Sequence, residues 1–143
     1  MMDYELRLPL VLPFNFFMMT QTALIFGSFF GFTAVIFGAF GAHLLKKKIT
    51  SDQLQSFETG VKYQMYHAIV LLILGFNLEI NTSIDTYIIN SFILGTLLFS
   101  FSIYGLVLSS AKSKKLKFLG PITPLGGLFL VVGWLLLIYK FVV

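Results

Sequence analysis

Apolar residues fill four long stretches of the chain, and most polar and charged residues lie in the connections between them. The stretches are residues 22–45, 61–78, 87–109 and 125–143. Each is close to the ~20 residues that an α-helix needs to cross the ~30 Å hydrocarbon core of a bilayer. The pattern therefore predicts an all-α fold, a four-helix transmembrane bundle with short loops.

A helix is also expected before the second apolar stretch. Thr50 is followed three residues later by Gln53, which is typical of a capping box that starts a helix at Ser51. No proline or strong helix breaker follows before Leu78. This segment is therefore either a separate cytoplasmic helix between spans 1 and 2 or the beginning of the second span.

Residues 1–19 form an N-terminal extension with a different pattern. Pro9 and Pro13 interrupt its apolar residues, so a helix that crosses the bilayer is not expected there. Two interpretations are open: the extension lies at the membrane interface, or Met18 or Met19 is the true start and the start at Met1 is mis-assigned. Residues 20–143 are expected to form a single four-span transmembrane domain.

Most of the lysines lie after the first and third apolar stretches, whereas residues 79–86 hold neither lysine nor arginine. Basic connections face the cytoplasm in membrane proteins. We therefore expect a multi-pass protein of the bacterial inner (plasma) membrane with both termini outside the cytoplasm. Membrane orientation accounts for the net charge of +4, and nucleic acid is not expected as a partner.

Composition points to the bilayer as the surroundings of this chain. Hydrophobic residues make up 57% and charged residues 11%, against roughly 25% charged residues in soluble domains. Membrane lipids are therefore expected partners. The sequence has no cysteine, which excludes disulfides, thiolate metal sites and a cysteine nucleophile.

Small residues recur at helical spacing in three of the apolar stretches. In lipid, small residues at a seam let two helices approach closely, so these positions are predicted to pack helices together. They are Gly27, Gly31, Ala34, Gly38, Gly41, Gly95, Ser102, Gly105, Gly126 and Gly133.

Five polar residues are predicted to form one connected cluster beneath the cytoplasmic face. The predicted topology puts them at one depth, and buried polar groups need partners. They are His43, Gln64, His67, Tyr104 and Thr123. Two interpretations are open: the cluster joins the helices by hydrogen bonds, or it is a site for a ligand, ion or partner.

No motif in the sequence indicates a catalytic residue. The two histidines lack a metal-binding spacing such as H-E-x-x-H, and no serine lies in a nucleophile elbow. Haem ligation by His43 and His67 is geometrically conceivable at similar depths but has no further support in the sequence. We therefore expect no enzyme activity, no metal site and no cofactor.

Three motifs, taken in order, resemble one known family. They are GAFGAH at residues 38–43, YQMYHA at 63–68 and PITPLGG at 121–127. The chain resembles the domain of unknown function 423 family over about residues 24–137, nearly the whole chain. The resemblance implies a four-span helical protein of unknown biochemical role, with bacterial inner-membrane members and a mitochondrial relative.

The resemblance also assigns motif positions. They carry over to Gly38, Gly41, His43, Thr59, Gly60, Tyr63, Gln64, Tyr66, His67, Ser102, Tyr104, Pro121, Thr123, Pro124, Gly126, Gly127 and Trp134. The chain departs from the family pattern at two places. Phe101 stands before Ser102, where the family pattern has glycine before the serine, and the N-terminal extension is generally lacking in family members.

Two functions follow as hypotheses. The first is a non-enzymatic accessory or structural membrane component that acts by association with another membrane protein or with itself. The alternative is a binding protein or carrier for a small amphipathic ligand, a lipid or quinone, held at the polar layer near the cytoplasmic face. The small residues listed above form stripes along their helices. The two hypotheses differ in whether these stripes pack against helices of the same chain or remain free for a partner.

Overall fold

The computed structural model describes residues 12–112, 114 and 116–143, and all regular structure in these ranges is helical. The elements are α1 (Leu12–Ile36), the π-helix η1 (Phe37–Gly41), α2 (Ala42–Leu45), α3 (Ser51–Asn77), α4 (Ser83–Thr96), the π-helix η2 (Leu97–Phe101), α5 (Ser102–Ala111), the 3-10 helix η3 (Lys117–Leu119) and α6 (Ile122–Val142). Because α1–η1–α2 and α4–η2–α5 are each continuous, the chain forms four long helical rods.

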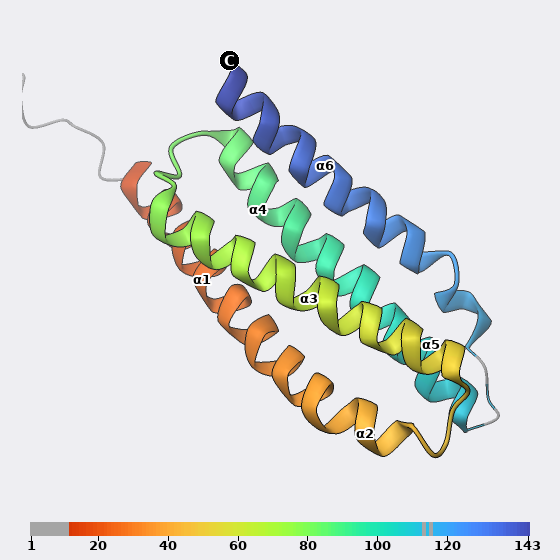
Figure 1. The fold of residues 1–143 in the computed structure, drawn as a ribbon. Coiled ribbons are helices and arrows are strands. Elements are labelled where there is room, and N and C mark those ends of the chain that lie inside the picture. Colours follow the sequence, from red (N-terminus) through yellow and green to blue (C-terminus); the bar gives the residue numbers. More distant parts are fainter. Residues whose placement is uncertain (1–11, 113, 115) are drawn as a thin grey trace, which may run out of the picture.

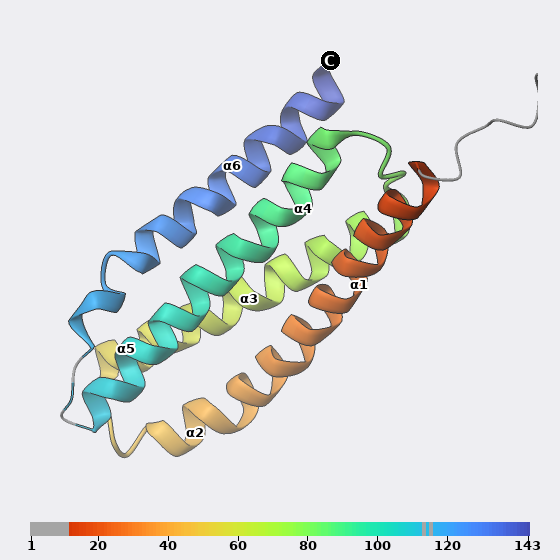
Figure 2. The same ribbon diagram turned by 180° about the vertical axis from the view of Figure 1, so that it is seen from behind.

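The rods run alternately up and down as two hairpins (Figures 1 and 2). α1 packs along α3, α4 packs along α6, and α3 joins the two pairs by contacting α4 and α5. Over the described residues, α1 and α6 do not contact each other. The two middle rods are therefore enclosed on more sides than the two outer ones.

The predicted capping box is confirmed. The Gln53 amide N–H donates to Thr50 Oγ1 at 3.2 Å, and the Thr50 N–H donates to Gln53 Oε1 at 3.0 Å. The helix that starts there runs without a break to Asn77. The alternative of a separate cytoplasmic helix is therefore wrong, because nothing in this segment interrupts the backbone hydrogen bonds.

Three helices in the described ranges are long and apolar enough to cross a membrane: Phe17–Leu45, Ser83–Ala111 and Lys117–Val142. α3 is not one of them. Its first half carries Asp52, Glu58 and Lys62, which lower its hydropathy. Length and composition therefore suit three of the four described rods to a membrane.

The first helix begins at Leu12, earlier than the apolar pattern predicts. Pro13 lies in its first turn, where the missing N–H would have had no helical partner. Pro13 therefore does not prevent a helix here, and the helix long and apolar enough to cross a membrane is Phe17–Leu45, which begins near the end of the predicted extension. The first part of the predicted extension of residues 1–19, residues 1–11, lies outside the described residues.

The small residues face neighbouring helices of the same chain. A Cβ atom added at Gly27 would lie 2.9 Å from Leu72 Cγ and 3.0 Å from the Ala68 carbonyl oxygen of α3. A Cβ at Gly95 would lie 2.6 Å from Leu130 of α6. The stripes are therefore used inside the chain.

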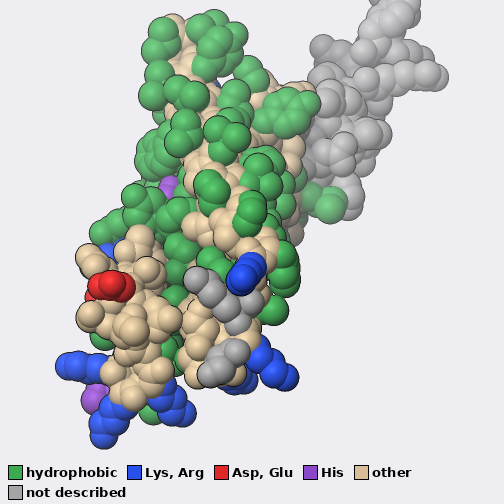
Figure 3. Space-filling model, turned by 90° about the vertical axis from the view of Figure 1, so that its right-hand side faces the viewer, with side chains coloured by type: hydrophobic (Ala, Val, Ile, Leu, Met, Phe, Trp, Pro, Cys, Tyr) green, Lys and Arg blue, Asp and Glu red, His purple; other side chains and the backbone are tan. Residues whose placement is uncertain are grey.

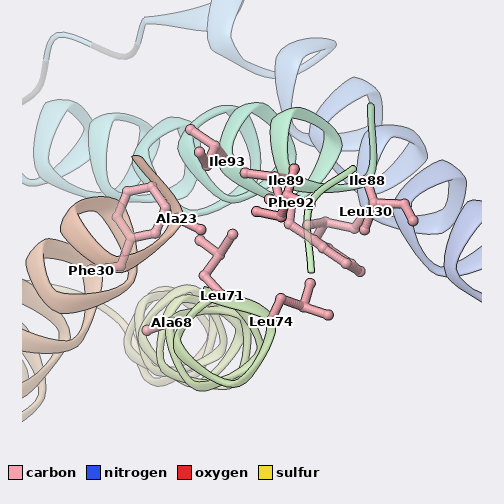
Figure 4. Packing of buried hydrophobic residues seen from close by; sticks show 11 residues of the cluster. Ala23, Phe30, Ala68, Leu71, Leu74, Ile88, Ile89, Phe92, Ile93 and Leu130 are labelled. Atoms are coloured by element: carbon pink, nitrogen blue, oxygen red, sulfur yellow. The ribbon is translucent and has the colours of Figure 1, made fainter. Parts of the chain in front are cut away.

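The apolar core lies between these close contacts. Figure 4 shows its side chains converging from α1, α3, α4 and α6, and their members include Phe30, Leu71, Ile88, Phe92 and Leu130. Large apolar side chains also cover the outside of the rods, among them Phe32 of α1, Phe76 of α3 and Leu135 of α6. Such a surface suits lipid and not water.

Charged side chains gather toward the ends of the rods. Lysine side chains lie at the end where α2 leads into α3 and α5 leads into α6, beside a polar surface (Figure 3). We call this the lysine end. The opposite end carries the connection from α3 to α4 and the end of α6 (Figure 1).

Candidate functional site

The inward face of α3 carries Gly60, Gln64 and His67, all of which are buried. Their spacing of four and three residues puts them on one side of a helix. A Cβ atom at Gly60 would lie 2.9 Å from Tyr104 Cε1, so α3 and α5 meet there at close range. The polar groups above and below this contact must therefore find partners within the protein.

Gln64 joins three rods. It is fully buried, and its Oε1 accepts a hydrogen bond from the Tyr104 hydroxyl at 2.8 Å. Its Nε2 donates to Thr33 Oγ1 at 2.6 Å and to the Phe30 carbonyl oxygen at 2.8 Å. Both donors and the acceptor of this amide are thus used between α1, α3 and α5.

His67 joins α3 to α6. Its Nδ1 lies 2.8 Å from the Tyr63 carbonyl oxygen, and Trp134 Nε1 donates to its Nε2 at 3.3 Å. A carbonyl only accepts and an indole N–H only donates, so these partners fit the neutral tautomer with its proton on Nδ1. The Phe92 ring, with its centroid 5.7 Å away, closes the inner side of the imidazole.

The π-helix η2 supplies two further bonds between rods. Ser100 is fully buried and donates to the Gly60 carbonyl oxygen at 2.8 Å. Ser102, directly after η2, donates to the Phe99 carbonyl oxygen at 2.9 Å and lies 2.7 Å from Thr123 Oγ1. Ser100 and Trp134 were not among the predicted site residues, although both carry polar groups that need partners in lipid.

The five predicted residues do not form a single cluster. Hydrogen bonds join Gln64 only to Tyr104 among them, while His67 pairs with Trp134 and Thr123 pairs with Ser102. His43 is exposed, and its side chain makes no hydrogen bond within the described ranges. It follows η1, and a π-turn rotates all later residues relative to a continuous α-helix.

Gln64→Leu is expected to destabilise the protein by about 1–3 kcal/mol, because the Tyr104 hydroxyl would stay buried without its acceptor. Thermal unfolding in detergent measures this. Gln55→Leu, at an exposed position of the same helix, is the control and should change little. Adding Tyr104→Phe to Gln64→Leu should restore part of the loss. No recovery in the double variant would show that Tyr104 does not depend on Gln64.

A cleft of about 520 Å³ opens between the first half of α3, α5 and the start of α6. It lies beyond the Gly60–Tyr104 contact, toward the lysine end. Its lining residues are Asp52, Gln53, Ser56, Thr59, Ile103, Leu106, Val107, Ser110, Gly120 and Thr123. This volume is in the range of small-molecule sites, which run from about 300 to 1,000 Å³.

The opposite end holds a buried ion pair that the sequence analysis missed. Asp85 is fully buried and is paired with Lys140 of α6. Asp85 also accepts from the Asn81 and Thr82 amides, both at 3.0 Å, and from the Thr82 hydroxyl at 2.8 Å. The sequence contained evidence for this pair. Thr82 and Asp85 have capping-box spacing, and Lys140 lies in the last turn of α6.

In the part of the chain that the structure describes, no three histidine, aspartate or glutamate side chains come together as metal ligands. Both ring nitrogens of His67 are already engaged. The arrangement therefore offers a set of hydrogen bonds that hold four rods together and a cleft large enough for a ligand.

A family model described as "Protein of unknown function (DUF423)" matches residues 37–127. The UPF0382 membrane protein SAB0533 of Staphylococcus aureus is 41% identical over 118 residues, covering 80% of this chain and 90% of its own. The UPF0382 inner membrane protein YgdD of Escherichia coli is 37% identical over 122 residues, covering 85% and 89%. YwdK, a UPF0382 membrane protein of Bacillus subtilis, is 36% identical over 117 residues, covering 80% and 91%. No solved structure matches the chain.

Proposed function

Because the chain belongs to the DUF423 family of bacterial membrane proteins, which confirms the resemblance in its motifs, we propose that it is a four-span, non-enzymatic component of the inner membrane. In this role it is a structural or accessory protein that associates with lipids and with another membrane protein or itself. The proposal depends on one observation: buried polar side chains form hydrogen bonds between the rods of the chain. Those of Gln64, His67 and Ser100 are bound to neighbouring rods.

α3 is proposed as the fourth span. It runs antiparallel between α1 and α4, so it shares their depth (Figure 1). Its second half exposes Ile69, Ile73 and Phe76 to the outside of the bundle. The charged positions that lower its hydropathy lie in its first half, toward the lysine end, where polar groups reach water or headgroups. An even number of spans puts both termini on one side of the membrane, and the lysines of the two basic connections support placing those connections in the cytoplasm and the termini outside.

Single cysteines test this topology, because the native chain has none. A cysteine at Ser113, between α5 and η3, should react with a membrane-impermeant maleimide only after the inner membrane is opened. A cysteine at Asn81, between α3 and α4, should react in intact spheroplasts. Labelling of the Ser113 position from outside would overturn the topology.

A ligand-binding function is the second candidate, and one observation favours it. The small-residue stripes are consumed inside the chain, so they are not available to a partner helix, whereas the cleft of about 520 Å³ is open. A binding protein for a small amphipathic molecule would use this cleft. An accessory protein would instead use the exposed outer faces of α1 and α6.

Copurification separates the two candidates. The protein is extracted in a mild detergent, and both its protein partners and its retained lipids are identified by mass spectrometry. A stoichiometric membrane-protein partner supports the accessory function. A retained amphiphile in near-equimolar amount, released when the cleft is filled by Val107→Trp, supports the binding function. If neither a protein partner nor a retained amphiphile is found, the result supports a purely structural role.

A further inference from the structure

The cleft at the lysine end presents almost only hydrogen-bond acceptors. Ser56 donates to the Asp52 carbonyl oxygen at 2.9 Å, Thr59 to that of Gln55 at 2.9 Å and Ser110 to that of Leu106 at 2.8 Å. Each hydroxyl has a single proton, so these three side chains have only lone pairs left for a ligand.

Thr123 is committed in the same way. Its Oγ1 lies 2.7 Å from Ser102 Oγ, and Ser102 has already given its proton to the Phe99 carbonyl oxygen. Thr123 is therefore the donor in this pair, and its proton is used as well. All four hydroxyl groups of the cleft can therefore only accept further hydrogen bonds, which favours a ligand that donates them.

Asp52 adds a negative charge to this lining. It is exposed, and its carboxylate has no hydrogen-bond or ion-pair partner among the residues that the structure describes. The Gln53 side-chain oxygen is taken by the Thr50 amide, which leaves its NH₂ group as a donor at the mouth. An acceptor-rich cleft with one free carboxylate matches a primary ammonium group, which has three donors and one positive charge.

The remaining surroundings favour an amine that belongs to a phospholipid. The wall formed by Ile103, Leu106 and Val107 is apolar. Lys112 and Lys117 lie at the two ends of the connection that follows Ser110 and precedes Gly120, and Figure 3 shows lysine side chains beside the polar surface at this end. Lysines bind phosphate as point charges. The cleft itself thus matches an ammonium and a hydrocarbon group, and the lysines that could meet a phosphate lie at the same end without lining the cleft.

We propose that the cleft between α3 and α5 binds the phosphoethanolamine headgroup of a membrane lipid, with the ammonium on Asp52 and the hydroxyl oxygens and the phosphate near the lysines. The proposal rests on the ligand-binding function proposed above and names its ligand. It also accounts for the hydroxyls of Ser56 and Thr59 on α3 and of Ser110 on α5, which line the same cleft.

Native mass spectrometry of the full chain in detergent tests the proposal with three lipids that share acyl chains. Phosphatidylethanolamine should bind about tenfold more tightly than phosphatidylcholine, whose trimethylated nitrogen has no N–H donor, or phosphatidylglycerol, which has no amine. Asp52→Asn should remove this preference and leave phosphatidylglycerol binding unchanged. Glu58→Gln, an exposed carboxylate on the same helix but outside the cleft, is the matched control and should retain the preference.

Each outcome decides a different point. Equal binding of the three lipids, or an unchanged preference in Asp52→Asn, would overturn the headgroup assignment while a retained amphiphile still supported the binding function. Competition by putrescine as strong as by phosphatidylethanolamine would show a site for a free amine and overturn the lipid assignment. Absence of any retained or added lipid in the wild-type protein would overturn the binding function itself. Unchanged thermal unfolding of Asp52→Asn shows that folding is intact.

Discussion

Gly126→Ala is expected to prevent α6 from docking and to destabilise the protein by about 3 kcal/mol or more, at the upper end of the cost of overpacking. The added Cβ would lie 2.3 Å from the Phe99 amide nitrogen and 2.7 Å from Phe99 Cα. Both are backbone atoms of η2, which cannot move aside like the end of a flexible side chain. α6 would therefore have to shift as a whole.

Such a shift would disturb every contact that α6 makes further along. These include the Thr123–Ser102 bond and the Trp134–His67 bond. Thermal unfolding in detergent and the yield of folded protein measure the effect. Gly127→Ala is a closely matched control, because its Cβ would lie 3.8 Å from the Phe99 ring, an ordinary contact. Alanine also favours a helix over glycine by about 1 kcal/mol. Equal loss in both variants would contradict the assignment of the clash to η2.

Asp85→Ala is expected to be the second most damaging change, with a loss of about 3–5 kcal/mol, the usual cost of removing one partner of a buried ion pair. The Lys140 ammonium would lose its carboxylate in a position that leaves its side chain only 23% exposed. The Asn81 and Thr82 amides would lose their acceptor at the same time. The pair therefore fixes both the start of α4 and the end of α6.

The same connection offers the control. Glu79 is exposed, and its carboxylate accepts one bond, from Asn81 Nδ2 at 3.3 Å. Glu79→Gln should change the unfolding free energy by no more than about 0.5 kcal/mol. Combining Asp85→Ala with Lys140→Met should recover part of the loss, since no buried charge then lacks a partner. A double variant as unstable as the sum of the single variants would show that the two side chains act independently.

Hydropathy alone was enough to find the helices, because lipid-facing and core-facing positions are both apolar. The four predicted stretches lie in helices except for their last residues at Leu78 and Val143, and the predicted end at Leu45 coincides with that of α2. Capping chemistry is equally local, so the start of α3 at Ser51 could be predicted from Thr50 and Gln53. Features that depend only on neighbouring residues were thus accessible from the sequence.

The direction in which a side chain points from its helix could not be predicted from the sequence in the same way. Depth in the membrane can be counted in residues, but the side on which His43 lies depends on each turn before it. η1 and η2 contain no residue type that marks a π-turn, and each changes the direction of the side chains after it. Of the predicted cluster, His43 and Tyr104 follow these π-turns, and the polar residues form the separate pairs Gln64–Tyr104, His67–Trp134 and Ser102–Thr123.

Contacts between segments distant in the sequence were the other gap. Asp85 and Lys140 are 55 residues apart, and their contact requires the tight packing of α4 and η2 on α6 that Gly95 and Gly126 allow. Both charges were visible in the sequence. The sequence did not reveal that α6 lies beside α4 and not beside α1, because glycine spacing shows that a helix packs closely without showing against which partner.

The main helix contacts lie within two hairpins, α1 with α3 and α4 with α6, and this order suits assembly of the protein during its synthesis. α1 meets its main partner α3 as soon as the ribosome has made residues up to about Asn77, and α6 meets its main partner α4 as the last segment to emerge. Chains fold from the N-terminus as they are made. Because α1 and α6 share no contact over the described residues, the first hairpin can close in the membrane before the last helix exists, and the second hairpin can then dock onto it as a preformed pair.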